Sequence, residues 1–293
     1  MNKSLTGLSI FFLNLISRLP FRLLYIFADL LYVGLFHIIR YRRKVTQSNL
    51  ANAFPEKSVQ ERNLIEKKYY RYLADMIMES LKMSSISQEE VQNRCRLINP
   101  EEVQRHYDHG RSVLLASGHY ANWEWANLVL ALGFQEKLFV IFKPLTDKIF
   151  GDHLNKLRSR FGAIMVPMKL TLRKIVELKN QKYMFGFASD QTPTRHESQY
   201  FTSFLNQPTA VFLGLEKISK TTNQPVVFLN IYRIKRGHYE YTFTTLVEDP
   251  SATAEYEITN LHTQKLEEII RRKPELWLWS HKRWKFTPQE LNK

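Results

Sequence analysis

The sequence predicts an α/β fold with a mixed, mainly parallel sheet flanked by helices, preceded by a hydrophobic helical membrane anchor. Short apolar runs, each ended by turn residues, alternate with longer segments that carry apolar residues at helical spacing. Two of these runs flank Lys235–Gly237 and indicate a β-hairpin, which makes the sheet mixed. The first forty residues or so are rich in apolar side chains. We therefore divide the chain into an anchor, residues 1–44, and a second domain, residues 45–293.

The anchor contains two apolar runs. The first covers residues 5–16, and the second covers residues 23–39 and is interrupted by Asp29 and His37. The 17 residues of the second run are at the short limit for spanning a bilayer, and Asp29 would be costly at mid-depth. A transmembrane helix and an interfacial helix therefore both stay open as interpretations. A third alternative is a pair of buried helices in a soluble protein.

Four cations, Arg40, Arg42, Arg43 and Lys44, follow the second run. The positive-inside rule places such a cluster at the cytoplasmic boundary, so we expect the second domain to face the cytoplasm. A cleaved signal peptide would be followed by small residues instead. The net charge of +14 favours an anionic membrane surface as a partner. None of the common nucleic-acid-binding motifs is visible, so nucleic acid is not expected.

Strands and helices alternate along the second domain. A long amphipathic helix over residues 59–83 and a polar segment over residues 87–107 precede the first core strand, residues 112–116. Further strands are expected over residues 138–142, 163–166, 183–188, 225–234 and 238–247. Further helices are expected over residues 147–161, 170–178, 209–220 and 254–272. Open α/β sheets place their chemistry at the carboxyl ends of strands, so polar residues at strand ends are the candidates for a site.

His119 and Glu124 lie on the turn that follows the first core strand. Ser117-Gly118 ends that strand, and residues 123–132 have the pattern of a following helix. A histidine can take a proton from a hydroxyl near neutral pH, and a carboxylate at its other ring nitrogen fixes the tautomer. Four intervening residues can bring the two side chains into contact across a turn that opens a helix. The pair therefore predicts an acyl-transfer site. The alternative is a surface histidine and a first-turn glutamate that favours the helix dipole.

Three other places offer groups that an acyl transfer needs. Arg158 and Arg160 end a helix and point to different sides, so at most one is expected to stabilise an oxyanion or an anionic substrate. Lys143 follows a strand and is a candidate for binding an anionic group. Asp190 and Gln191 follow another strand and are candidates for binding sugar hydroxyls. Each feature also has a local explanation as a helix-end, strand-end or turn residue.

Metal and thiol chemistry are not indicated. The nine histidines are scattered, with no Cys/His cluster and no His-Glu-x-x-His helix, so no metal site is expected. Cys95 is the single cysteine, which suits a reducing compartment. It lies in a polar run and is not expected to act as a nucleophile.

The order of these motifs resembles the lipid A biosynthesis (lauroyl or myristoyl) acyltransferase family, within the superfamily that carries a His-x-x-x-x-Asp/Glu box. That family follows the box with an Arg-Pro or Lys-Pro strand end, an Arg-x-Arg-Phe-Gly-like helix end, an Asp-Gln or Asp-His loop and a C-terminal Pro-Glu-x-x-x-Trp segment before basic residues. Here the set is His119–Glu124, Lys143-Pro144, Arg158–Gly162, Asp190-Gln191 and Pro274–Arg283. The likeness covers nearly the whole chain, to about Phe286.

The resemblance implies transfer of a fatty acyl group from acyl carrier protein, or less often coenzyme A, to a hydroxyl of a lipid A precursor. The acceptor would be a membrane glycolipid at the cytoplasmic face of a bacterial inner membrane, and no cofactor beyond the thioester is implied. His119 corresponds to the family's base, Glu124 to its acidic partner and Arg158 to the arginine near the thioester carbonyl. Glu124 stands where many relatives have Asp, and Lys143 stands where Arg is commoner. Lysine cannot bind a phosphate through two parallel hydrogen bonds as arginine does.

The predicted mechanism is direct attack by the acceptor hydroxyl without an acyl-enzyme, because the chain has no Gly-x-Ser-x-Gly elbow. His119 would deprotonate the hydroxyl, and backbone N–H groups near Asn122, together with Arg158, would stabilise the oxyanion. Three alternatives stay open. They are an acyltransferase for another lipid such as an amino-acid lipid or phospholipid, a nonenzymatic membrane-associated binding protein, and a hydrolase that gives the acyl group to water.

Overall fold

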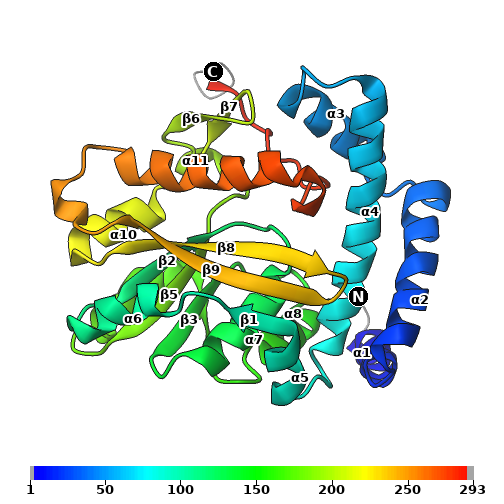
Figure 1. Ribbon diagram of the computed structural model, residues 1–293, viewed down its shortest axis with the longest axis horizontal. Helices are drawn as coiled ribbons and strands as arrows, with labels where there is room; N and C mark the ends of the chain where they lie inside the picture. The colour runs from blue at the N-terminus through cyan, green and yellow to red at the C-terminus, as the bar shows by residue number, and fades with distance from the viewer. Residues whose placement is uncertain (1–2, 289–293) are drawn as a thin grey trace.

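The centre of the molecule is a seven-stranded sheet with the strand order β1-β9-β8-β2-β5-β3-β4. Figure 1 shows this computed structural model, which describes residues 3–288. Neighbouring strands of the sheet run parallel, except for the antiparallel pair β8 and β9. The prediction of a mixed, mainly parallel sheet flanked by helices is therefore confirmed.

The strands of this sheet are β1 (Cys95–Leu97), β2 (Val113–Ser117), β3 (Lys137–Phe142), β4 (Ile164–Pro167), β5 (Tyr183–Ala188), β8 (Val226–Lys235) and β9 (His238–Val247). The helices of the body are α3 (Arg43–Ala53), α4 (Val59–Lys82), α5 (Gln88–Arg94), α6 (Glu101–Asp108), α7 (Trp123–Gly133), α8 (Lys148–Arg158), α9 (Thr171–Glu177), α10 (Gly214–Thr222) and α11 (Glu257–Arg272). Figure 1 shows α10 and α11 on one face of the sheet, α5, α6 and α7 on the other, and α4 upright beyond the β8–β9 hairpin.

The strand order places the carboxyl ends of β2 and β5 side by side. Strand β5 comes fourth in the run β2, β3, β4, β5 along the chain, yet it lies between β2 and β3 in the sheet. The register pairs Ser117 at the end of β2 with Ala188 at the end of β5. Segments that leave these two strands therefore start as neighbours, at a point where the strand order changes direction. Such a point is where open α/β sheets bind ligands.

The N-terminal segment forms α1 (Lys3–Ser17) and α2 (Phe21–Val33), followed by one π-helical stretch, Gly34–Ile38. Pro20 separates the two α-helices because proline ends one helix and suits the residue before the next. Helix α2 packs one face against α4 and leaves the other exposed, and its buried residues are Phe21, Leu24 and Ala28. Residues 21–38 are long and apolar enough to cross a membrane, with a mean hydropathy of 1.6.

The hairpin of β6 (Phe201–Phe204) and β7 (Gln207–Ala210) was not foreseen from the sequence. The helix expected over residues 209–220 begins only at Gly214, because its first residues belong to this second, two-stranded sheet. Leu205 and Asn206 close the hairpin with φ angles of 51° and 64°. A tight turn with two positive φ angles normally contains glycine, so Leu-Asn gives no strong hairpin signal.

Candidate active site

His119 lies on the tight turn between β2 and α7, two residues beyond the end of the strand. Gly118 is needed there, because a Cβ atom would lie 2.8 Å from the Leu266 side chain and 3.2 Å from a carboxylate oxygen of Asp190. Ala121 takes a left-handed φ of 48° before α7 begins. Its N–H donates to the carbonyl of Leu276, which ties the turn to the C-terminal segment. Residues from other segments of the chain therefore fix the conformation of this turn.

The carboxylate that contacts the His119 imidazole belongs to Asp190. Its Oδ1 lies 2.6 Å from His119 Nδ1, and its Oδ2 accepts the backbone N–H of His119 at 2.8 Å. The indole N–H of Trp277 donates to the same Oδ2 at 2.8 Å. Asp190 follows β5 by two residues, as His119 follows β2 by two, so the register of the two strands brings them together.

The pair is arranged so that His119 Nε2 can accept a proton. Burial by itself would raise the pKa of Asp190, but His119 and the hydrogen bonds from Trp277 and the His119 backbone lower it to about 2. Burial disfavours the imidazolium, yet the Asp190 carboxylate outweighs burial and raises the pKa of His119. An ionised Asp190 fixes the Nδ1–H tautomer, which leaves a lone pair on Nε2. The amide nitrogen of Gln191 lies 3.2 Å from Nε2 and donates to it.

Glu124 does not orient His119, so that predicted contact is wrong. Its carboxylate instead forms a two-point ion pair with Arg158, with Arg158 Nε to Oε2 at 2.7 Å and Nη2 to Oε1 at 2.5 Å. The physical reason is that α7 directs Glu124 toward the last turn of α8, while the position beside the imidazole is taken by Asp190 from the neighbouring strand. The Glu124 side chain is 8% exposed and that of Arg158 19%, so this pair is largely shielded from water.

The Asn122 side chain is buried and bound within the fold, so it is not placed to contact a substrate. Its Oδ1 accepts the backbone N–H of Trp125 as the N-cap of α7, and its Nδ2 donates to Glu79 Oε2 at 2.7 Å. Several backbone N–H groups of the turn are also in use, at His119, Ala121 and Trp125. Arg158 is therefore the better placed donor for an oxyanion.

Arg158 is the last residue of α8 and Arg160 lies two residues beyond it, and their side chains go to different places. Arg158 lines the cavity beside His119, whereas Arg160 donates to the carbonyl of Met83 after α4 and lies on the exposed surface. The predicted substrate contact of Arg160 is thus not made from this position. Lys143 and Gln191 both line the same cavity as Arg158.

A cavity of about 540 Å³ lies beside His119 and is lined by α7, α8 and the sheet. His119, Arg158 and Gln191 are among its polar lining residues, together with Lys143, Lys148, Asp152 and Asn155. The lining from α7 consists of Trp123, Ala126, Asn127 and Leu130, which share one helical face at spacings of three and four. The sheet contributes apolar residues that include Leu115, Leu138 and Val140. A cavity of this size, lined by apolar side chains and by polar groups that include His119 and Arg158, has room for a hydrocarbon chain that carries a reactive carbonyl.

Sequence reasoning missed the structural roles of Asp190, Trp277 and Glu79. Asp190 was expected to bind sugar hydroxyls, but it is buried and accepts three hydrogen bonds from His119 and Trp277. The available signal was the shared position of His119 and Asp190, each two residues beyond an apolar strand. Among residues 3–288, the structure groups no three His, Cys, Asp or Glu side chains that could hold a metal ion.

A histidine held by a buried carboxylate at a strand end, beside a cavity with room for a hydrocarbon chain, fits an enzyme that transfers acyl groups. The chain belongs to the bacterial lipid A biosynthesis acyltransferase family, whose model matches residues 2–286. It is 24% identical to the lipid A biosynthesis acyltransferase of Haemophilus influenzae over 284 residues, which cover 93% of this chain and 85% of that protein. It is 21% identical to the lipid A biosynthesis palmitoleoyltransferase of Escherichia coli over 252 residues, covering 85% and 81%.

Replacing Asp190 tests the imidazole–carboxylate pair. We expect Asp190→Asn to lower the rate of acyl transfer by roughly 10²-fold or more, because a neutral amide no longer fixes the Nδ1–H tautomer or stabilises the imidazolium. The measurement is the rate of acyl transfer at saturating thioester, with circular dichroism to verify folding. The matched control is Asp249→Asn, which makes the same change at an exposed carboxylate that caps the short helix Pro250–Ala252. Equal rates for Asp190→Asn and the wild type would exclude this role.

Proposed function

We propose that this acyltransferase moves a fatty acyl group from an acyl carrier protein thioester to a hydroxyl of a lipid A precursor at the cytoplasmic face of the inner membrane. The observation that carries the proposal is that His119 lines the 540 Å³ cavity while its Nδ1 is bound to Asp190, which leaves Nε2 as the ring nitrogen that can take a proton. The family and the names of its members support an acceptor of the lipid A type. Coenzyme A is the alternative thiol carrier, and no other cofactor enters the reaction.

His119 is the general base in this proposal. Its Nε2 takes the proton of the acceptor hydroxyl, and the hydroxyl oxygen forms a bond to the thioester carbon. The carbon–sulfur bond then breaks, and the leaving thiolate takes the proton from the imidazolium. Gln191, at 3.2 Å from Nε2, marks the place where the acceptor hydroxyl binds. Cys95 is buried, and burial raises the pKa of its thiol to about 12, which supports direct attack without an acyl-enzyme.

Arg158 stabilises the oxyanion that forms on the thioester carbonyl. Glu124 holds its Nε and Nη2, which fixes the plane of the guanidinium while its Nη1 makes no hydrogen bond to another described residue. A donor that is already oriented needs no reorganisation when charge develops, which is the most effective form of electrostatic catalysis. Lys143, at the cavity wall near the end of β3, binds an anionic group of the donor or acceptor as a point charge.

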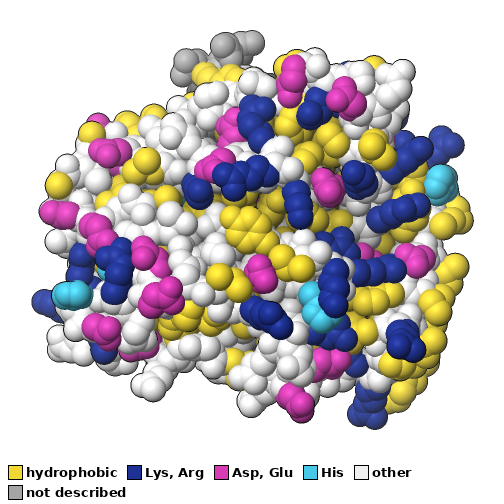
Figure 2. Space-filling view, viewed as in Figure 1, with side chains coloured by type: hydrophobic (Ala, Val, Ile, Leu, Met, Phe, Trp, Pro, Cys, Tyr) yellow, Lys and Arg dark blue, Asp and Glu magenta, His cyan; other side chains and the backbone are white. Residues whose placement is uncertain are grey.

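The outer faces of α1 and α2 bind the membrane in this proposal. Leu8, Phe11, Phe12 and Leu15 of α1 are 53–63% exposed, and Ile26, Phe27 and Leu30 of α2 are also exposed. Figure 2 shows hydrophobic side chains along the edge where these helices lie, with Lys and Arg between them. Exposed apolar area of this extent marks an interaction surface, and the cations suit anionic lipid.

In this proposal α1 and α2 lie on the bilayer and do not cross it. Asp29 of α2 accepts from Arg236 at 2.7 Å, and Arg236 also pairs with Asp75 of α4, so α2 is fastened to the body. Thr6 of α1 donates to Asp147, the N-cap of α8, and α8 lines the cavity. Helix α1 therefore lies next to a helix that lines the cavity, and we expect the lipid acceptor to reach His119 from this side.

Acyl transfer from acyl carrier protein to a lipid A precursor in vesicles tests the proposed function. We expect His119→Ala to lower the rate by roughly 10²-fold or more. In the wild type, kcat/KM should fall as the pH drops through the pKa of His119, because the base acts deprotonated. Since Asp190 raises that pKa, the midpoint should lie above 6.5. Thiol release that needs no lipid acceptor would indicate a hydrolase, and no release at all would indicate a binding protein.

A larger side chain on the cavity face of α7 tests where the acyl chain lies. We expect Ala126→Phe to shift the preferred acyl group to a shorter chain, because the ring fills part of the cavity floor. The measurement is a competition among acyl carrier protein thioesters of different chain lengths, read by mass spectrometry of the product. Ala131→Phe places the same ring on α7 outside the cavity lining and should leave the preference unchanged. An unchanged preference in Ala126→Phe would place the chain elsewhere.

Vesicle flotation tests the membrane surface. We expect Phe11→Glu/Phe12→Glu to reduce binding to vesicles that contain anionic phospholipid, because two exposed apolar side chains become charged. Substitution at two exposed positions of the body, Glu89→Gln and Lys179→Gln, should leave binding unchanged. Full binding by the α1 variant would show that another surface contacts the lipid.

A further inference from the structure

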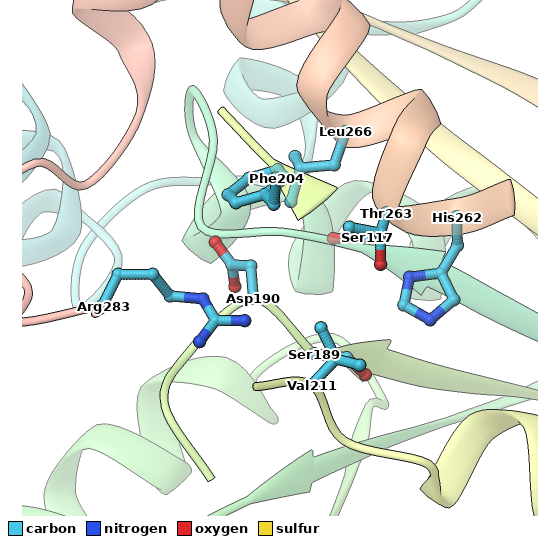
Figure 3. Close-up of a pocket in the computed structure, with 9 residues that line it drawn as sticks. All are labelled: Ser117, Ser189, Asp190, Phe204, Val211, His262, Thr263, Leu266 and Arg283. Carbon is cyan, nitrogen blue, oxygen red and sulfur yellow. The ribbon is translucent and has the colours of Figure 1, made fainter. Parts of the chain in front are cut away.

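A buried cation, Arg283, lies close to Asp190, and both line one small cavity (Figure 3). Arg283 is 2% exposed, and one of its Nη2 N–H groups donates to the carbonyl of Ala210 at 2.6 Å. Its Nε and Nη1 have no hydrogen-bond partner among the described residues. Leaving guanidinium N–H groups unpaired in the interior is costly, so this arrangement requires an explanation.

A small cavity lies beside the Arg283 guanidinium, and Phe204, Val211 and Leu266 form its apolar lining. Figure 3 shows the guanidinium turned toward the Asp190 carboxylate, with Ser189 close by and His262 on the far side. The cavity measures about 10 Å³, which is room for about one water molecule. Its polar lining comes from Ser117, Ser189, Asp190, His262, Thr263 and Arg283. The Nε2 atom of His262 is a second buried polar atom without a partner among the described residues.

The lining of the cavity selects water as its occupant. Arg283 supplies donors, while Asp190 and the hydroxyls of Ser189 and Thr263 supply acceptors, so a water molecule can make three or four hydrogen bonds there. A small anion would meet the negative charge of Asp190, and a small cation would meet the positive charge of Arg283. Burial lowers the pKa of Arg283 to about 10, so the guanidinium stays charged at neutral pH.

We propose that Arg283 is a positioning residue that acts through one buried water on Asp190 and thereby sets the proton affinity of His119. The inference rests on the proposed role of His119 as the base. Asp190 then interacts with two groups, the His119 imidazole directly and the Arg283 guanidinium through the water. A fixed positive charge in that place opposes protonation of His119. It therefore keeps more of the imidazole in the neutral form that can accept a proton near pH 7.

None of the other charged and titratable groups around the His119 imidazole is expected to mask the effect of the Arg283 charge. Glu124 of α7 and Arg158 of α8 neutralise each other as an ion pair. His262 of α11 and His281 of the C-terminal segment are held neutral, because burial lowers the pKa of each to about 4. Asp190 is ionised throughout the working range. Removing the positive charge at residue 283 should therefore act on His119 through Asp190.

The experiment compares wild type with Arg283→Gln, Arg283→Lys and Arg111→Gln. The first removes the charge, the second keeps it, and the third removes an equal charge before the opposite end of β2. The readout is the pH dependence of His119 carbethoxylation by diethyl pyrocarbonate, followed by mass spectrometry of the peptide that contains it. This reagent modifies neutral imidazole, and the His119 side chain is 19% exposed. The acid limb of kcat/KM for acyl transfer is the second readout.

We expect Arg283→Gln to raise the midpoint of His119 modification by roughly half a pH unit or more, as the loss of a nearby buried charge requires. Arg283→Lys should return the midpoint toward the wild-type value, and Arg111→Gln should leave it in place. The acid limb of acyl transfer should shift in the same direction. A purely structural Arg283 would change stability without moving the midpoint, and that result would overturn the inference.

The proposed function and the inference fail in different ways. A shifted midpoint in a protein that transfers no acyl group would preserve the inference and overturn the function. Normal acyl transfer by the wild type, with a midpoint that Arg283→Gln does not move, would preserve the proposed function and overturn the inference. If Arg283→Gln does not fold, a high-resolution crystal structure of the wild type decides the matter. One ordered water bonded to Arg283 and Asp190 would support the inference, and a dry cavity would overturn it.

Discussion

The interaction on which the site depends is the grip of one buried carboxylate on His119. Asp190 accepts three hydrogen bonds, from the imidazole, the His119 backbone and the Trp277 indole. These donors come from the end of β2 and from the C-terminal segment, while Asp190 itself follows β5. The pair therefore forms only when the sheet has its native strand order and the C-terminal segment is docked. Gly118 is the local condition, because a side chain there would collide with Leu266 and crowd Asp190.

A second buried carboxylate holds the far side of the same turn. Glu79 of α4 accepts from Asn122, Tyr25 and Tyr239 at 2.7 to 3.0 Å. Asn122 caps α7, and Ala121 before it keeps a left-handed backbone that costs free energy unless its surroundings enforce it. The turn is thus tied to α4 and, through Tyr25, to α2. The helix with an exposed apolar face and the turn that carries His119 are parts of one rigid network.

The sequence predicted elements well where the signal is local. The strand expected over residues 183–188 is β5 itself, because an apolar run bounded by turn residues fixes both ends. The pairing of the site residues was missed because it depends on strand order. His119 and Asp190 are 71 positions apart, and only the insertion of β5 beside β2 makes them neighbours. The predicted contact between Glu124 and His119 rests on their closeness along the chain, which is a weak guide to contacts across a sheet.

The corrected pairing gives each acidic residue its own partner. Asp190 contacts His119, the proposed base, and Glu124 contacts Arg158, which we propose faces the developing oxyanion. Glutamate suits the second task because its longer side chain reaches from the first turn of α7 to the last turn of α8 and meets the guanidinium at two points. An Arg158 without this partner would carry an uncompensated charge next to the imidazole and would lower its basicity. Glu124 thus acts on the proposed base indirectly, by neutralising and orienting Arg158.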